Sequence, residues 1–207
     1  MKLAIFGSTG SVGIHLVQQA LQAGHHVTAF TRTPSKLDLQ DPRLRIVQGD
    51  VLQDQHQIEQ AIEGQDAVLV TLGAGAKGRI RAAGTRNIIL AMQKHGVERL
   101  ICQSTLGAGE SVGNLNLKWR FLFGVPLRMA MADHEQQEQW VRDSHLDWTI
   151  VRPSSFTDGP LTQDYKFGFT STERNLDLTV SRADVAHFMI EQIDQDAFTR
   201  QAVSLSC

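Results

Sequence analysis

Short apolar runs alternate with amphipathic stretches of helical period through the first half of the chain. This alternation is typical of a parallel β-sheet whose strands are joined by crossover helices. It predicts strands at Lys2–Phe6, Val27–Thr31, Leu44–Gln48, Ala67–Thr71, Arg99–Gln103 and Trp148–Arg152. It predicts helices at Val12–Ala23, Gln55–Glu63, Gly78–His95 and His134–Asp143, the second of them capped by Asp54. The predicted fold class is therefore α/β, with helices on both faces of a parallel sheet.

The chain has 207 residues, enough for one α/β domain with a buried core and short for two. No repeat, low-complexity segment or Pro- or Ser-rich linker marks a domain boundary. Residues 110–131 break the alternation with aromatic side chains crowded around a basic pair, so we expect an insertion there that acts as a substrate lid. We assign residues 153–180 to the substrate side of the same domain.

Composition and charge exclude several classes of partner. The chain has 20 Lys and Arg against 22 Asp and Glu, a formal net charge of -2 and a pI near 6.4. This balance offers no basic surface for nucleic acid or for an anionic membrane. Neither a signal sequence nor a membrane-spanning run is expected. Cys102 and Cys207 match no zinc spacing and no disulfide framework, which favours a reducing compartment. We expect a cytoplasmic monomer with a small-molecule substrate.

The sequence GSTGSVG at residues 7–13 lies between a predicted strand and a predicted helix. A helix that begins at a glycine turn leaves backbone N–H groups free to bind an anion. Gly7 permits the tight turn, Gly10 lets the backbone approach a pyrophosphate, and Gly13 allows close helix–strand packing. A purely structural turn is the alternative, but the strand–turn–helix context favours a dinucleotide site. Further donors are the hydroxyls of Ser8, Thr9 and Ser11.

The residues after the second predicted strand decide which dinucleotide is favoured. NAD sites place a carboxylate there for the ribose 2′-hydroxyl, whereas this chain reads TRTPSK. Arg32 and Lys36 are suited to a 2′-phosphate, so NADP is predicted over NAD, and a solvated basic turn is the alternative. Asp50, after the third strand, is equally suited to the adenine amine and to a turn. Small residues after the fourth strand, Thr71–Gly75, allow the backbone to line the cofactor.

The chain resembles the atypical short-chain dehydrogenase/reductase proteins, and more narrowly the NADPH-dependent flavin reductases, also called biliverdin-IXβ reductases. The resemblance covers nearly the whole chain and is carried by GSTGSVG, TRTPSKL, GDVLQ, GQDAVLVTLG, GTRNIILAMQKHGV, MADHEQQEQWVRDS, PLTQDY and DVAHFMIEQI. It implies a single Rossmann-like, doubly wound domain with NADPH along the carboxyl edge of the sheet. It also implies a shallow site for flavins or linear tetrapyrroles above the nicotinamide.

The resemblance also implies which residues hold the cofactor. The pyrophosphate would be held by Gly7, Thr9, Gly10, Ser11 and Val12, the 2′-phosphate by Arg32 and Lys36, and the adenine by Asp50 and Val51. Toward the nicotinamide would lie Leu72, Gly73, Cys102, Gln103, Ser104, His134, Pro153 and Ser154. Two departures stand out. The segment Gly73–Gly84 is shorter than in the animal enzymes, so Lys77, Arg79 and Arg81 have no individual counterparts. SSFTDG replaces a histidine-containing stretch, so the role of that histidine is either lost or passed to Ser154 or Ser155.

The chain lacks the tyrosine–lysine pair that serves many short-chain dehydrogenases as proton donor. Its single tyrosine, Tyr165, is followed directly by Lys166, and Ala130 and His134 stand where the pair would fall. Hydride transfer to a flavin needs mainly positioning. The resemblance assigns Ser104 to orient the nicotinamide or the substrate, whereas spacing alone favours a strand-end turn.

His134 is equally suited to hold the cofactor ribose, to relay a proton near neutral pH, or to begin a helix capped by Asp133. Three aromatic residues in the predicted insertion allow two interpretations: Trp119, Phe121 and Phe123. They form either an apolar wall for a planar substrate, or ordinary core or a partner surface.

Three functions follow, in order of preference. The first is an NADPH-dependent reductase of free flavins (FMN, FAD, riboflavin), with biliverdin-type linear tetrapyrroles as further acceptors. The second is a non-catalytic NADP-binding redox sensor that resembles negative transcriptional regulators, motivated by the missing tyrosine and histidine. The third, an NADP-dependent sugar epimerase or ketone reductase, suffers from the absent tyrosine–lysine pair. No metal is predicted, because no histidine has a partner at ligand spacing, and no Gly-x-Ser-x-Gly elbow indicates a hydrolase.

Overall fold

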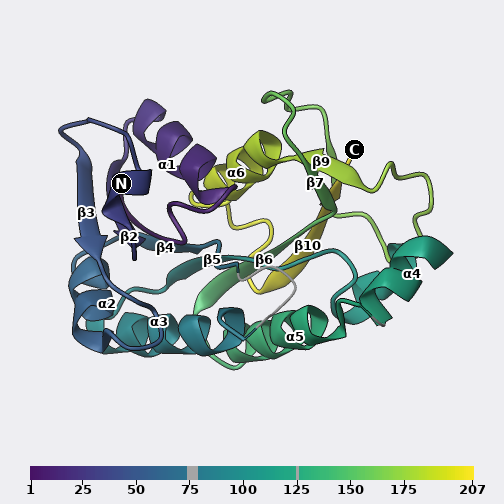
Figure 1. Ribbon diagram of the computed structural model, residues 1–207, viewed down its shortest axis with the longest axis horizontal. Coiled ribbons are helices and arrows are strands. Elements are labelled where there is room, and N and C mark those ends of the chain that lie inside the picture. Colours follow the sequence, from purple (N-terminus) through teal and green to yellow (C-terminus); the bar gives the residue numbers. More distant parts are fainter. Residues whose placement is uncertain (74–78, 125) are drawn as a thin grey trace.

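The computed structural model describes residues 1–73, 79–124 and 126–207. The main sheet has eight strands in the order β3-β2-β1-β4-β5-β6-β10-β8 (Figure 1). In chain order its strands are β1 (Lys2–Phe6), β2 (His26–Thr31), β3 (Leu44–Gln48), β4 (Ala67–Val70), β5 (Arg99–Gln103), β6 (Asp147–Pro153), β8 (Lys166–Phe167) and β10 (Gln201–Ser206). All neighbours pair in parallel except β8, which runs antiparallel to β10. The predicted α/β, Rossmann-like fold is confirmed.

Helices cover both faces of this sheet (Figure 1). One face carries α1 (Gly13–Gln22) and α6 (Arg182–Glu191), and the other carries α2 (Gln55–Ile62), α3 (Arg81–His95) and α5 (Arg128–Arg142). The alternation of side chains along β1 explains why both faces are covered. Leu3 and Ile5 pack into the core under α1 and α6, whereas Ala4 and Phe6 pack into the core under α2 and α3. The sheet therefore separates two hydrophobic cores, one on each face.

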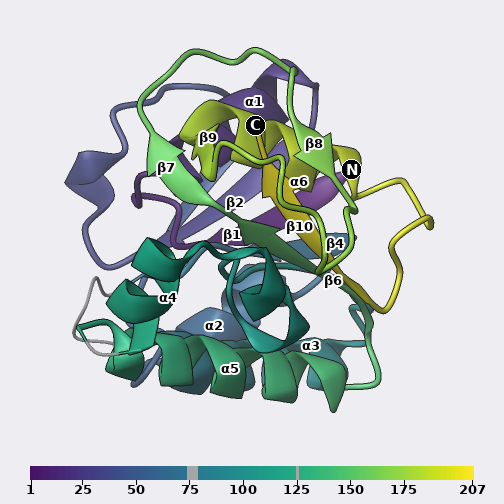
Figure 2. The same cartoon turned by 90° about the vertical axis from the view of Figure 1, so that its right-hand side faces the viewer.

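The remaining elements lie near one end of the sheet. The helix α4 (Leu117–Gly124) contacts α5, and Figure 2 shows it on the same side of the molecule as the small parallel sheet of β7 and β9. The bounds of these strands are Ser155–Thr157 and Thr179–Ser181. Two short 3₁₀ helices, η1 (Pro34–Lys36) and η3 (Gly109–Asn114), follow β2 and β5.

The order of β1 and β4 creates the position where ligands bind in such folds. The chain runs outward from β1 to β2 and β3, then returns to place β4 on the opposite side of β1, with Ile5 opposite Ala29 on one side and Leu69 on the other. Crossover connections leave in opposite directions at this point, so a crevice opens at the carboxyl ends of β1 and β4. The glycine turn and Thr71 meet there.

Several boundaries differ from the sequence-based prediction. The helix predicted to start at His134 begins at Arg128, so the predicted insertion 110–131 includes the first turn of α5. Asp133 is therefore not the cap of its own helix, because its carboxylate instead accepts backbone hydrogen bonds from the start of α3. Asp54 does stand at the N-cap of α2, but its carboxylate accepts the N–H of Asp50. The predicted helix start at Gly78 lies outside the described residues.

Within the described ranges, no helix is both long enough and apolar enough to cross a membrane.

Candidate active site

A cavity of about 650 Å³ opens along the carboxyl ends of the parallel strands. Its walls come from the loops after β1, β2, β4, β5 and β6, together with the starts of α1 and α3 and parts of α4, α5 and β7. One continuous space therefore joins segments that are far apart in the sequence. Its size falls in the range of ligand-binding clefts.

The glycine turn forms one end of this cavity. Gly7 has a φ of +83°, and a Cβ there would lie 2.6 Å from the carbonyl oxygen of Thr71. A Cβ on Gly13 would lie 2.0 Å from the carbonyl oxygen of Gly7, so the start of α1 packs directly on the turn. These approaches are possible only for glycine. The positions expected at the pyrophosphate all line the cavity: Gly7, Thr9, Gly10, Ser11 and Val12.

Two cations follow β2 and line the cavity beside this turn. Arg32 and Lys36 are both in its wall, and the guanidinium of Arg32 lies 4.0 Å from the carboxylate of Asp50. The side chain of Arg32 is 65% exposed, so it is free to close on a phosphate. Thr31, at the end of β2, supplies a hydroxyl that contacts Thr9 Oγ1 at 3.0 Å. This end of the cavity fits a phosphorylated adenosine.

Asp50 does not line the cavity itself, although its neighbours Gly49 and Val51 do. Its Oδ1 accepts the backbone N–H of Leu52 at 2.8 Å, which is the hydrogen bond of a turn. The structure thus supports the turn interpretation of Asp50, and the adenine contact of Val51 stays a prediction.

The residues expected near the nicotinamide divide into two groups. Six of them line the cavity: Leu72, Gly73, Gln103, Ser104, His134 and Ser154. Cys102 and Pro153 are not among the lining residues, so the cavity gives no support to the prediction that they face the cofactor. The Cys102 thiol points into the core, where Gln137 donates to its Sγ at 3.2 Å and burial raises its pKa.

Ser104 and His134 lie together at this end of the cavity. The Ser104 Oγ is 3.5 Å from His134 Nδ1, and both residues are buried. Burial, with the positive charge of Arg81 as the second cause, lowers the pKa of His134 from 6.5 to about 3. The imidazole is therefore neutral at pH 7. This lowered pKa argues against the hypothesis that His134 relays a proton by titrating near neutral pH.

Two buried polar atoms beside Ser104 make no hydrogen bond to the described part of the chain. These are Gln103 Oε1 and Ser154 Oγ, both on residues that line the cavity. A buried polar atom without a partner costs about 1–3 kcal/mol, so the pair is better satisfied by a ligand than by an empty site. An amide such as the nicotinamide carboxamide offers both a donor and an acceptor. Gln103 and Ser154, together with the glycine turn and Arg32, form a site that fits NADPH.

The outer wall of the cavity is apolar and was only partly anticipated. Trp119 lines the cavity, in agreement with the interpretation of the aromatic cluster as an apolar wall. Phe121 is 70% exposed and does not line it. The side chain of Phe123 lies outside the description. Sequence patterns did not identify the other members of this wall, which are Leu115, Leu127, Phe156 and Leu178. They lie in or next to η3, α5, β7 and β9, which only the tertiary fold brings together.

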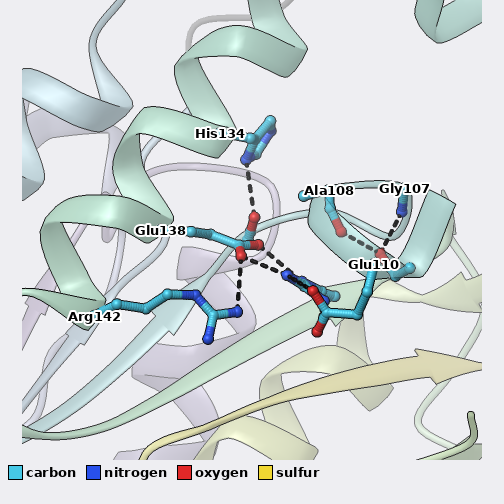
Figure 3. Close-up of polar contacts among 9 residues, drawn as sticks. Gly107, Ala108, Glu110, His134, Glu138 and Arg142 are labelled. Atoms are coloured by element: carbon cyan, nitrogen blue, oxygen red, sulfur yellow. Dashed lines mark hydrogen bonds and ion pairs between the residues drawn. The ribbon is translucent and has the colours of Figure 1, made fainter. Parts of the chain in front are cut away.

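A buried ion-pair network supports the site from below (Figure 3). Arg152, at the end of β6, donates from Nε and Nη2 to Glu138 of α5 at 2.9 and 2.6 Å. Its Nη1 also donates to Glu110 of η3 at 2.8 Å. His134 lies one helical turn before Glu138, so the network ties the part of α5 that carries the imidazole to the end of β6.

Within residues 1–73, 79–124 and 126–207, no group of three His, Cys, Asp or Glu side chains is placed to hold a metal ion.

The geometry agrees with the relatives of this chain. The protein belongs to the NAD(P)H-binding family, because the sequence model of that family matches residues 7–196. The predicted nicotinamide cofactor is thereby confirmed.

Three individual proteins illustrate the relationship. The chain is similar to ChuY, an anaerobilin reductase from Escherichia coli O157:H7, with 25% identity, a TM-score of 0.80, and coverage of 99% of this chain and 96% of ChuY. A short-chain dehydrogenase/reductase from Veillonella parvula, solved in complex with NADP, has 24% identity, a TM-score of 0.78 and coverage of 99% and 93%. The photosystem II assembly factor Ycf39 of Synechocystis is 26% identical over 213 residues, which are 97% of this chain and 61% of Ycf39.

Proposed function

We propose that the protein is an NADPH-dependent reductase that transfers a hydride to a planar conjugated acceptor, either a free flavin or a biliverdin-type linear tetrapyrrole. The observation that carries this proposal is the single cavity that joins the glycine turn and Arg32 at one end to Ser104 and an apolar wall at the other. The first end suits a phosphorylated dinucleotide. The second end suits a flat, largely apolar ring system.

The residues near Ser104 position the reactants. NADPH, when bound, supplies the hydride. The backbone N–H of Ser104 donates to Val151 at 2.7 Å, so the strand end holds this residue in place. With the imidazole proton on Nε2, His134 Nδ1 accepts a hydrogen bond from the Ser104 hydroxyl. The Ser104 oxygen can then accept a hydrogen bond from the nicotinamide carboxamide. Gln103 Oε1 and Ser154 Oγ offer further partners to the same amide.

No side chain among the described cavity residues titrates near neutral pH in a position to donate a proton. His134 is neutral, and the wall contains no carboxylate. The proton that completes reduction of the acceptor therefore comes from solvent, through the open side of the cavity. Such a site works by positioning, which suits acceptors that are already electrophilic.

The test is consumption of NADPH, followed by its absorbance, with FMN, FAD, riboflavin, biliverdin and anaerobilin as acceptors. Anaerobilin is included because ChuY is an anaerobilin reductase. We expect turnover with at least one acceptor and a fall of about 5-fold in kcat for Ser104→Ala, the loss of one hydrogen bond. Absence of turnover with every acceptor would overturn the proposal.

A second candidate is a non-catalytic NADP-binding sensor. The observation that favours it is the lack of a titrating proton donor at Ser104 and His134. One relative, Ycf39, is an assembly factor by name. Tight NADP binding without turnover in the same assay, with a partner protein recovered in a nucleotide-dependent manner, would favour this candidate over the reductase.

A further inference from the structure

Arg81 is a buried cation in the cavity wall that the hydride transfer described above leaves unused. It is the first residue of α3, it is only 9% exposed, and it lines the cavity near Gly73. Buried arginines are normally paired or bind an anion. The contacts of Arg81 with Asp133 decide which of these applies.

Both carboxylate oxygens of Asp133 accept backbone N–H groups at the start of α3. Its Oδ2 accepts the N–H of Arg81 at 3.1 Å and its Oδ1 accepts the N–H of Ala82 at 3.2 Å. The guanidinium contributes only one longer contact, from Nη1 to Oδ2 at 3.5 Å. A guanidinium has five N–H donors. Asp133 thus caps α3 and orients Arg81, but it does not form a bidentate pair that would occupy the fork.

The charges of the described cavity wall are one-sided. It contains the cations Arg32, Lys36 and Arg81 and no carboxylate. Arg32 and Lys36 follow β2 and are matched by the 2′-phosphate of NADPH. Arg81 belongs to the opposite end, because Asp133 ties it to the turn of α5 that carries His134 and its charge acts on that imidazole. The Asp133 carboxylate, 3.5 Å from Nη1, is the counter-charge of Arg81 there and leaves most of its N–H donors unused. A cleft with one sign of charge concentrates anionic ligands.

We propose that Arg81 binds an acidic group of the hydride acceptor, a carboxylate or a phosphate, and thereby selects anionic acceptors over neutral ones. This inference rests on the proposed function, since it assigns a substrate class to the same site. The planar guanidinium suits either oxyanion. Arg81 is a specificity-determining residue that holds the acceptor's charged arm while the ring system lies against the apolar wall near Ser104.

The experiment compares two pairs of acceptors that differ in the acidic group. Biliverdin is paired with its dimethyl ester, which lacks the free carboxylates, and FMN is paired with riboflavin, which lacks the phosphate. Each acceptor is titrated at equilibrium against the NADP⁺-loaded protein and then tested for NADPH consumption. The variants are Arg81→Gln, Arg81→Lys and, as a matched control on the same helix, Arg86→Gln. Arg86 is exposed and stacks on Trp140, 5.2 Å from its ring centroid.

We expect Arg81→Gln to weaken binding of at least one acidic acceptor by about 10-fold or more, the usual effect of losing a charge-assisted hydrogen bond. Binding of the matched neutral acceptor and of NADPH should change by less than about 2-fold. Arg81→Lys should retain part of the preference, and Arg86→Gln should retain all of it. The biliverdin pair reports on a carboxylate and the FMN pair on a phosphate.

Equal losses for the acidic and neutral members of both pairs, or a loss of NADPH affinity in Arg81→Gln, would overturn the proposal. So would a wild-type protein that binds neither acidic acceptor more tightly than its neutral partner. The binding titration separates this inference from the proposed function: preferential, Arg81-dependent binding without turnover contradicts the reductase assignment and leaves the anion site standing.

Discussion

Arg152 and Glu138 form a bidentate ion pair between the end of β6 and the middle of α5, with both side chains buried (Figure 3). The side chains are only 2% and 6% exposed, so neither charge is solvated by bulk water. A third partner, Glu110, joins Arg152 from η3, and its side chain is 66% exposed. Arg152 therefore connects the sheet to α5 through Glu138, and to the segment that leads into α4 through Glu110.

Breaking this pair should destabilise the fold. Arg152→Met leaves the Glu138 carboxylate buried without its main partner, and removal of one member of a buried pair costs about 3–5 kcal/mol. Urea denaturation should show a loss of this order in the free energy of unfolding. Glu110→Gln is the matched control and should cost less than about 1 kcal/mol, because exposed ion pairs contribute little. Similar losses in both variants would contradict the distinction between buried and exposed partners.

The pH dependence of stability should contain a contribution from His134. Its pKa is lowered in the folded protein from 6.5 to about 3, first by burial and then by Arg81. As the pH falls below 6.5, the unfolded chain takes up the proton while the folded protein does not, so stability is lost progressively down to about pH 3. The slope from one such group is at most about 1.4 kcal/mol per pH unit.

His134→Gln should remove this contribution and flatten the stability profile over the same range. Unfolding midpoints measured at a series of pH values test the prediction, with His15→Gln, on α1, as a control that keeps the wild-type slope. An unchanged slope in His134→Gln would show that the imidazole is not held neutral.

The cofactor preference should depend on Arg32. Arg32→Ala removes a charge-assisted contact to the 2′-phosphate, so the Kd for NADPH should rise about 10- to 100-fold. The Kd for NADH, which lacks this phosphate, should stay nearly constant. Calorimetric titration of both nucleotides provides the comparison, with Arg45→Ala on β3 as a basic control outside the cavity wall. Equal losses for the two nucleotides would place the phosphate elsewhere.

Two glycines of the turn should respond differently to alanine. At Gly13 the new Cβ would lie 2.0 Å from the carbonyl oxygen of Gly7, so Gly13→Ala should destabilise the fold. At Gly10 the nearest atom is 3.0 Å away, which a small shift relieves, so Gly10→Ala should fold but bind NADPH more weakly. Thermal unfolding and nucleotide titration separate the two effects. A stable Gly13→Ala protein would contradict the packing described for the turn.

The sequence was sufficient to predict the parallel sheet and the cofactor end of the cavity because both depend on local signals. The strand β5, for example, is centred on the apolar residues Leu100–Cys102 and has the bounds expected, and GSTGSVG contains its own turn geometry. The strand β10 and the helix α6 were not among the predicted elements. QAVSLS has only a weak alternating pattern, and its place beside β6 depends on a pairing across the whole chain.

The acceptor end of the cavity was less predictable because its residues are defined by contacts between distant segments. Asp133 looked like a cap for its own helix, yet it caps α3, which begins 52 residues earlier at Arg81. The sequence around Asp133 would look the same whether its carboxylate caps its own helix or another one. The environment of His134 is likewise set by burial, which no local motif encodes. Only the family resemblance placed Cys102 toward the nicotinamide, whereas the structure packs its side chain in the core beside Gln137 of α5.

A crystal structure of the NADP⁺ complex is the most direct test of the account as a whole. It should show the pyrophosphate on the backbone of residues 7–12, the 2′-phosphate between Arg32 and Lys36, and the nicotinamide carboxamide within hydrogen-bonding distance of Gln103 or Ser104. A nucleotide bound outside this cavity, or with its nicotinamide at the Arg32 end, would contradict the assignment.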